Sequence, residues 1–112
     1  MARYFALYLA PIATVESWMA STTPAERKAS MEAWGKWMSD NAKSFADIGS
    51  PLGKTKKVTA DGVLSVKNDI LGYSIIEASS HDEAAKLLKG HPHFQIPGAS
   101  VEVLEITPMT GM

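Results

Sequence analysis

The sequence predicts an α+β fold, in which an antiparallel sheet is covered on one face by two helices. One observation is the segment at 71–92, where an apolar strand leads directly into a capped helix. Another is a similar strand-then-helix unit at the start of the chain, and a third is a hydrophobic strand at 101–107. Two βα units of this kind fold onto one sheet.

The first unit begins with an apolar strand at 3–10, which must be covered on both faces. Residues 11–22 are predicted to form a loop. Thr23 is then expected to cap a helix, with Pro24 in its first position and Glu26 completing a capping box. Apolar residues recur at helical spacing along this helix: Met31, Trp34, Met38, Ala42 and Phe45. The helix is expected to end before the turn-forming Gly and Pro residues at 49–53.

Between the two helices, Asp61-Gly62 forms a strong turn pattern. It predicts a hairpin with strands at 56–60 and 63–66. A turn at 68–69 then leads into a long strand at 70–78, which is rich in apolar and β-branched residues.

The second helix begins at a capping box formed by Ser80 and Glu83. Gly90 ends this helix, and Pro92 prevents it from resuming. The order is therefore strand, helix, hairpin, strand, helix, strand. With right-handed crossovers, this order predicts a ferredoxin-like antiparallel sheet with both helices on one face, in a single domain that spans 1–112.

The opposite face of this sheet has no predicted cover. It would carry alternate residues of the strands at 3–10 and 70–78, many of which are apolar. An exposed apolar face of that size predicts a partner. The simplest partner is a second copy that packs sheet to sheet about a two-fold axis, so we expect a homodimer through the open sheet face.

Composition limits the classes of function. With 112 residues the chain is long enough for one core. Eleven basic and twelve acidic side chains give a net charge of −1, and no basic face is evident, so nucleic acid is not an expected partner. The lack of cysteine excludes disulfides and thiol nucleophiles. No apolar run is long enough to span a bilayer. The apolar residues at 3–10 resemble a short signal peptide but lack its basic region and its small-residue cleavage site, which favours a cytoplasmic protein with no membrane partner.

Several short segments together resemble the YCII-related family, in family order over nearly the whole chain. They are Tyr4-Phe-Ala-Leu-Tyr, Gly49-Ser-Pro-Leu, the Asp61-Gly62 hairpin, Leu71-Gly-Tyr-Ser-Ile-Ile-Glu-Ala, Asp82-Glu-Ala, His91-Pro92 and Gly98-Ala-Ser-Val-Glu-Val. The resemblance implies a dimeric α+β barrel that acts on or binds a small organic molecule. The chain departs from the family in three ways: it has no histidine before His81, Val63 follows Asp61-Gly62 where a sister branch has Pro-Phe, and His91-Pro92 replaces Asp-Pro.

The predicted topology places three connections at one end of the sheet: the loop at 11–22, the turn at 68–69 and the loop at 90–98. This end is expected to gather the candidate site. Its candidate residues are His91, His93, Glu16, Trp18 and Glu102.

His93 is the candidate catalytic acid–base, oriented by Glu102 or Glu16, because the charge of histidine changes near neutral pH. The competing interpretation is a loop histidine that binds backbone and orders a Pro-rich turn. The candidates for substrate binding are His91, Glu16, Trp18 and Trp34. Trp34 is also interpreted as a core residue of the first helix.

No cofactor or metal is expected. The glycines form neither a phosphate loop nor a dinucleotide fingerprint. His91-Pro92-His93 lacks a third ligand at a recognised spacing.

Three hypotheses follow. The first is a cofactor-free lyase-, isomerase- or dehydrochlorinase-like enzyme that uses the loop histidine His93. The second is a non-catalytic protein that binds a small ligand between sheet and helices, and the third is a purely structural homodimeric domain.

Overall fold

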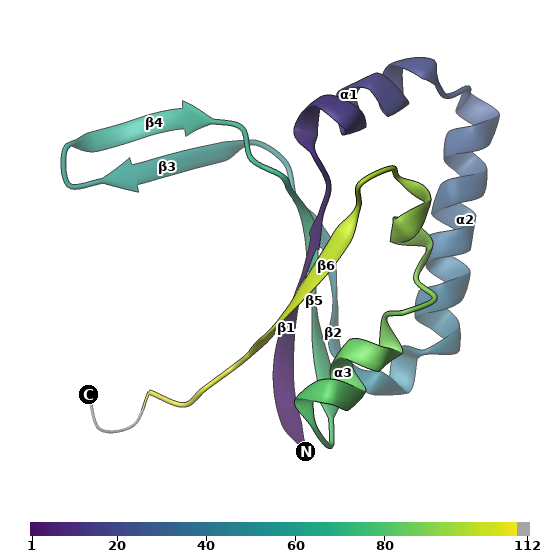
Figure 1. Cartoon of the computed structure of the whole chain (residues 1–112), viewed down its shortest axis with the longest axis vertical. Coiled ribbons are helices and arrows are strands. Elements are labelled where there is room, and N and C mark those ends of the chain that lie inside the picture. Colours follow the sequence, from purple (N-terminus) through teal and green to yellow (C-terminus); the bar gives the residue numbers. More distant parts are fainter. Residues whose placement is uncertain (110–112) are drawn as a thin grey trace.

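The computed structural model describes residues 1–109 and shows an α+β fold (Figure 1). Four antiparallel strands form one sheet in the order β2-β5-β1-β6. The strands of this sheet are β1 (Ala2–Leu9), β2 (Phe45–Pro51), β5 (Ile70–Ala78) and β6 (Ser100–Glu105). The α-helices are α1 (Ile12–Ser21), α2 (Pro24–Asp40) and α3 (His81–Leu87), and two 3₁₀ turns are η1 (Ala42–Ser44) and η2 (Pro92–Gln95).

The predicted helix starts are confirmed. Thr23 caps α2 through a full capping box with Glu26, and Pro24 occupies the first turn. Ser80 caps α3 by accepting a hydrogen bond from the backbone N–H of Glu83. Both predicted βα units therefore form, with β1 and β5 paired at the centre of the sheet.

Two predictions about the first half of the chain are wrong. Residues 12–21, expected to be a loop, form α1. The helix expected to run through Phe45 ends at Asp40, and Phe45 begins the edge strand β2. This strand contains Asp, Gly, Ser and Pro, so its composition indicated a turn. It pairs on one side only, with β5, and its register shifts twice, which relaxes the demand for β-forming residues.

The predicted hairpin forms, but it is not part of the main sheet. Strands β3 (Thr55–Thr59) and β4 (Gly62–Val66) make a separate two-stranded sheet that projects away from the body of the protein (Figure 1). We call residues 55–66 the arm. The fourth strand of the main sheet is β2 instead, which the sequence analysis missed.

The helices α2 and α3 cover one face of the sheet (Figure 1). The buried residues on this side come from β1, β5 and α3: Tyr4, Ala6, Tyr8, Ile76, Ala84 and Leu88. The alternate residues of β1 and β5 line the other face, which we call the open face. They are Phe5, Leu7, Leu9, Leu71, Tyr73 and Ile75, all of them only half-buried.

Candidate functional site

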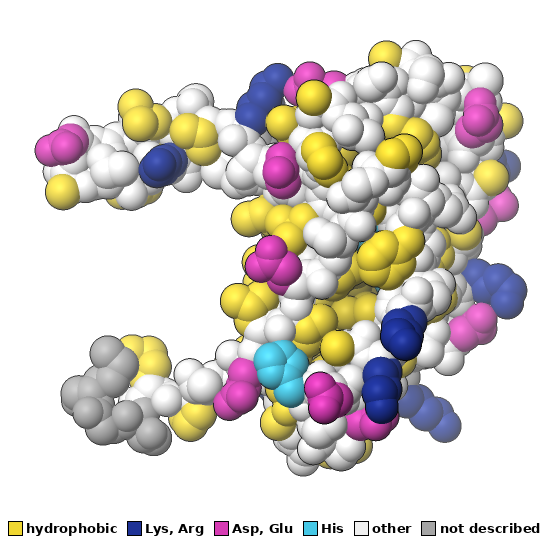
Figure 2. Space-filling view, viewed as in Figure 1, with side chains coloured by type: hydrophobic (Ala, Val, Ile, Leu, Met, Phe, Trp, Pro, Cys, Tyr) yellow, Lys and Arg dark blue, Asp and Glu magenta, His cyan; other side chains and the backbone are white. Residues whose placement is uncertain are grey.

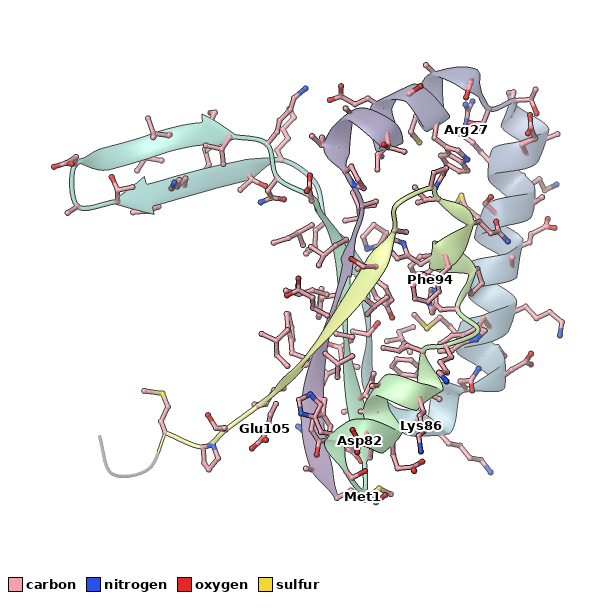
Figure 3. All side chains as sticks on the ribbon, in the orientation of Figure 1. Met1, Arg27, Asp82, Lys86, Phe94 and Glu105 are labelled. Atoms are coloured by element: carbon pink, nitrogen blue, oxygen red, sulfur yellow. The ribbon has the colours of Figure 1, made fainter. Side chains whose placement is uncertain are left out.

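Two histidines and three aromatic residues lie together between the sheet and α2. This histidine–aromatic cluster consists of Tyr8 from β1, Trp34 and Trp37 from α2, and His91 and His93 beside and within η2. The His91 ring lies 4.2 Å from Trp34, 4.4 Å from Trp37 and 5.0 Å from Tyr8, measured between ring centroids. Only 2% of His91 and 1% of His93 is exposed. Figure 3 shows side chains filling this layer between the sheet and α2.

Hydrogen bonds define where the two imidazoles carry their protons. The backbone N–H of His93 donates to Nδ1 of His91 at 2.9 Å, so neutral His91 holds its proton on Nε2. The Nε2 atom of His93 lies 2.8 Å from the carbonyl oxygen of Leu9. A carbonyl can only accept, so His93 Nε2 is the donor. His93 thus ties η2 to the end of β1.

A second chain of hydrogen bonds fixes the proton of Tyr8. The Ser74 hydroxyl donates to the carbonyl oxygen of Ile48 at 2.7 Å. Because the Ser74 hydroxyl hydrogen is used in that bond, Ser74 Oγ can only accept from Tyr8. The Tyr8 hydroxyl therefore donates to Ser74 Oγ at 2.9 Å. Burial raises the pKa of Tyr8, against a smaller lowering by Ser74. Tyr8 remains a neutral phenol over the physiological range.

The Nε2 atom of His91 is a buried donor with no hydrogen-bond partner in the part of the chain that the structure describes. Its immediate neighbours are the rings of Trp34, Trp37 and Tyr8, which offer only weak N–H···π contacts. Burial, together with nearby His93, lowers the pKa of His91 to about 4. His91 is accordingly neutral at pH 7, in an environment that opposes its protonation.

The structure brings three of the predicted site residues together and separates the others. His91, His93 and Trp34 share the cluster. Glu102 does not join them: it pairs with Leu7 across the strands and alternates with Val101 and Val103, which pack against the core. Glu102 therefore lies on the open face. The expected His93–Glu102 pairing is not formed, because the sheet stands between the two side chains.

Glu16 and Trp18 also lie outside the cluster, because residues 12–21 are helical. Glu16 forms an ion pair with Lys67 at 2.7 Å. Trp18 borders a shallow recess of about 320 Å³ between α1, α2 and η2. Neither side chain orients His93, whose Nε2 binds backbone instead. That contact matches the structural role that the sequence analysis set against catalysis.

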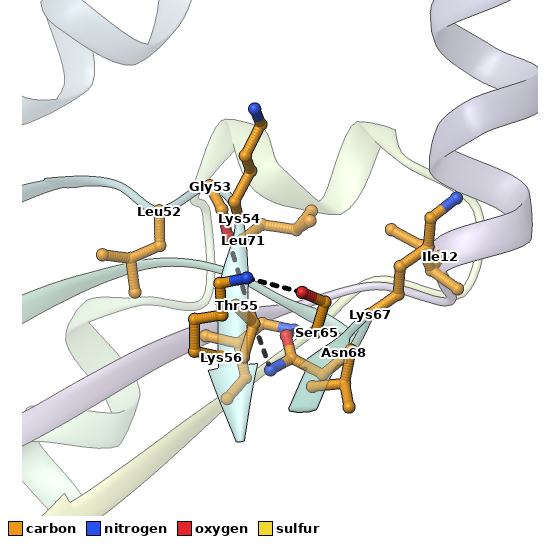
Figure 4. A pocket seen from close by; sticks show the side chains of 12 residues that line it. Ile12, Leu52, Gly53, Lys54, Thr55, Lys56, Ser65, Lys67, Asn68 and Leu71 are labelled. Atoms are coloured by element: carbon orange, nitrogen blue, oxygen red, sulfur yellow. Dashed lines mark hydrogen bonds between the residues drawn. The ribbon is translucent and has the colours of Figure 1, made fainter. Parts of the chain in front are cut away.

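A larger cavity of about 540 Å³ lies at the root of the arm (Figure 4). We call it the arm-root cavity. Its walls are mainly apolar, formed by Ile12, Leu52, Val66, Ile70 and Leu71. Lys54, Lys56 and Lys67 also line it, and its lining includes no acidic side chain. The volume falls within the range of small-molecule sites.

The lysines of this cavity differ in their pairing. Lys56 Nζ donates to Ser65 Oγ at 2.6 Å, and Lys67 pairs with Glu16. Lys54 forms no ion pair within residues 1–109. An ammonium beside apolar walls favours a ligand that carries both an anionic group and an apolar body.

The sequence did not predict this cavity or two of the five residues of the cluster. The cavity depends on the arm leaving the sheet, which the hairpin pattern does not reveal. Tyr8, Ser74 and Trp37 were not among the predicted site residues. The alternation of Tyr4, Ala6 and Tyr8 could have placed Tyr8 on the helix-covered face.

Neither a metal centre nor a membrane-spanning helix is found within residues 1–109. No group of three or more His, Cys, Asp or Glu side chains there is arranged to hold a metal ion. None of the helices in that range has the length and apolar character needed to cross a bilayer.

Comparison with known proteins does not assign this chain to a family. No protein-family model matches the chain, and no curated protein shows significant similarity to it. The resemblance to the YCII-related family therefore stays a prediction from the sequence.

Proposed function

We propose that this chain is a homodimeric small-molecule-binding protein with a ferredoxin-like sheet, of the dimeric α+β barrel type. The strand order β2-β5-β1-β6 with two βα units supports the fold proposal. The half-buried apolar side chains of the open face support the dimer. The YCII-related resemblance agrees with both.

The arm-root cavity is the proposed ligand site, and its chemistry is the observation that carries the proposal. Lys54 lies at the edge of a ligand-sized space whose walls are mostly apolar and whose lining lacks acidic groups. A small carboxylic acid with an aromatic or aliphatic body satisfies both features. Its carboxylate accepts hydrogen bonds from an ammonium, while its body covers Ile12, Ile70 and Leu71.

We propose binding rather than turnover because the cluster lacks the parts of an acid–base pair. His93 Nε2 is occupied by the Leu9 carbonyl oxygen, and Glu102 lies across the sheet. The lyase-, isomerase- or dehydrochlorinase-like alternative needs a carboxylate beside His93 or a rearrangement of η2. The structural-domain alternative leaves the arm-root cavity without a role.

We expect small aromatic and medium-chain carboxylates to raise the thermal stability of the wild-type protein, and their neutral amides to have no such effect. Binding at a hundred times the dissociation constant adds about 2.7 kcal/mol to the free energy of unfolding. Lys54→Gln should weaken binding about tenfold, the loss of one charge-assisted hydrogen bond of about 1.4 kcal/mol. Calorimetric titration measures both effects.

Lys89→Gln is the matched control, because Lys89 is an exposed lysine after α3, away from the cavity lining. It should bind the same carboxylates as the wild type does. A flat response to every carboxylate, or an equal loss in both variants, would contradict the proposed site.

We expect sedimentation equilibrium to show a dimer at about micromolar concentration. Leu7→Asp should raise the dimer dissociation constant by at least about a hundredfold. Leu7 lies on the open face opposite Glu102, so the substitution places a second negative charge beside an existing one. Met31→Asp is the control, since Met31 is 76% exposed on α2. A monomeric wild-type protein would refute the dimer.

A further inference from the structure

The single chain is more extended than a compact domain of its length. Its radius of gyration is 15.8 Å, whereas about 13 Å is typical for a compact chain of this size. Its accessible surface is 7735 Å², against roughly 6,000 Å² expected for a monomer of 12.1 kDa. The excess, roughly 1,700 Å², exceeds the approximately 800 Å² that each partner buries in a standard interface.

Two projections flank the open face (Figure 1). The arm extends from one end of the sheet, and the segment after β6 extends from the other end on the same side (Figure 1). The space-filling view shows a hollow between them (Figure 2). Most of the large exposed hydrophobic side chains in residues 1–109 belong to these projections and the sheet between them: Leu52, Val58, Val63, Leu64, Leu104, Ile106 and Met109.

The arm lacks cover of its own. Val58 and Val63 form a cross-strand pair and are 75% and 63% exposed. Leu64, on the other face of the arm, is 55% exposed. An isolated two-stranded hairpin is marginally stable in water, and β-branched side chains on it stabilise strands chiefly when they are covered.

The charges of the two projections are opposite. Residues 54–67, the arm with its flanking residues, contain four lysines and one aspartate. Residues 100–109 contain Glu102 and Glu105 and no basic side chain. Two arms laid side by side would repel each other, whereas an arm beside the end of β6 would attract it.

We propose that the arm of one copy packs against residues 105–109 at the end of β6 in a second copy, and that the second arm does the same in return. This inference rests on the proposed homodimer and specifies which segments of the two copies are in contact. A two-fold axis that runs across the strands brings each arm to the opposite end of the partner's sheet. The partner then borders the arm-root cavity, so the ligand site is complete only in the dimer.

The absence of cysteine from the chain makes this arrangement directly testable, because introduced thiols are unique. The variant Val63→Cys/Ile106→Cys carries one thiol on the arm and one at the end of β6. Treatment with a short bis-maleimide should give a covalent dimer in which mass spectrometry finds position 63 linked to position 106. A link within one chain would leave a monomer, which a denaturing gel distinguishes.

The two single variants are the controls, and neither should form covalent dimers efficiently. A dimer in sedimentation that gives 63–63 links, or no links, overturns the arm proposal and leaves the homodimer intact. A monomer in sedimentation overturns both.

Discussion

Gly49→Ala is expected to destabilise the protein by about 4 kcal/mol or more, close to the whole stability of a small domain. Gly49 has a φ of +80°, a region in which residues with a side chain are strained. A Cβ atom at this position would lie 1.6 Å from the carbonyl oxygen of Tyr73, which is backbone and cannot swing away. Strand β2 would have to separate from β5.

The damage should extend to the histidine–aromatic cluster. The neighbouring Ile48 carbonyl accepts the Ser74 proton, and this bond directs the Tyr8 hydroxyl to Ser74. Displacing β2 would remove the Ile48 carbonyl oxygen that accepts the hydrogen bond from Ser74. Urea unfolding monitored by tryptophan fluorescence measures the loss of stability.

Gly53→Ala is the matched control in the same part of the chain. Gly53 is exposed, its φ is not in the positive region, and nothing lies within 4 Å of an added Cβ. We expect a change within about 0.5 kcal/mol. If Gly49→Ala were equally mild, the close approach of β2 to β5 at this position would be wrong.

The sequence was informative where local chemistry and packing agree. Thr23 and Ser80 cap the helices that they predicted, and β1 and β5 are the central strands that their apolar residues indicated. It failed at β2, where Gly49 and Pro51 indicated a turn. There the backbone bonds to β5, together with a positive φ that only glycine tolerates easily, override the composition.

The candidate site was predictable only in part, because it depends on which face each strand presents. His91, His93 and Trp34 were predicted as site residues, and their rings lie together in the structure. Glu102 was nominated from its position in the chain, and a shift of one residue along a strand changes the face of its side chain. The arm-root cavity needed the position of the arm in space, which no local pattern of Asp61-Gly62 contains.

Acid is expected to destabilise the protein through His91 between about pH 6.5 and pH 4. The folded state holds the pKa of His91 at about 4, against an ordinary value of 6.5. Within that window the unfolded chain binds a proton that the folded protein excludes, so stability falls as pH falls and this contribution levels off below about 4. The difference amounts to roughly 3 kcal/mol. Urea unfolding at a series of pH values measures it.

His91→Asn separates this titration from the other roles of the residue. His91 caps η2 by accepting the backbone N–H of His93, and an asparagine side chain also accepts at such a position. The variant should be less stable at pH 7, because the space between Trp34 and Trp37 is left partly empty, but its stability should vary less from pH 6.5 to 4.

His81→Asn is the comparison variant, because His81 lies at the start of α3, outside the cluster, with its Nε2 atom 2.7 Å from the carbonyl oxygen of Val103. The groups that face His91 are His93 from η2, Tyr8 from β1, and the uncharged Trp34 and Trp37 from α2. None of these supplies a negative charge to stabilise an imidazolium at neutral pH. If His91→Asn kept the full acid sensitivity of the wild type, another group would be taking up the proton, and the neutral state assigned to buried His91 would be incorrect.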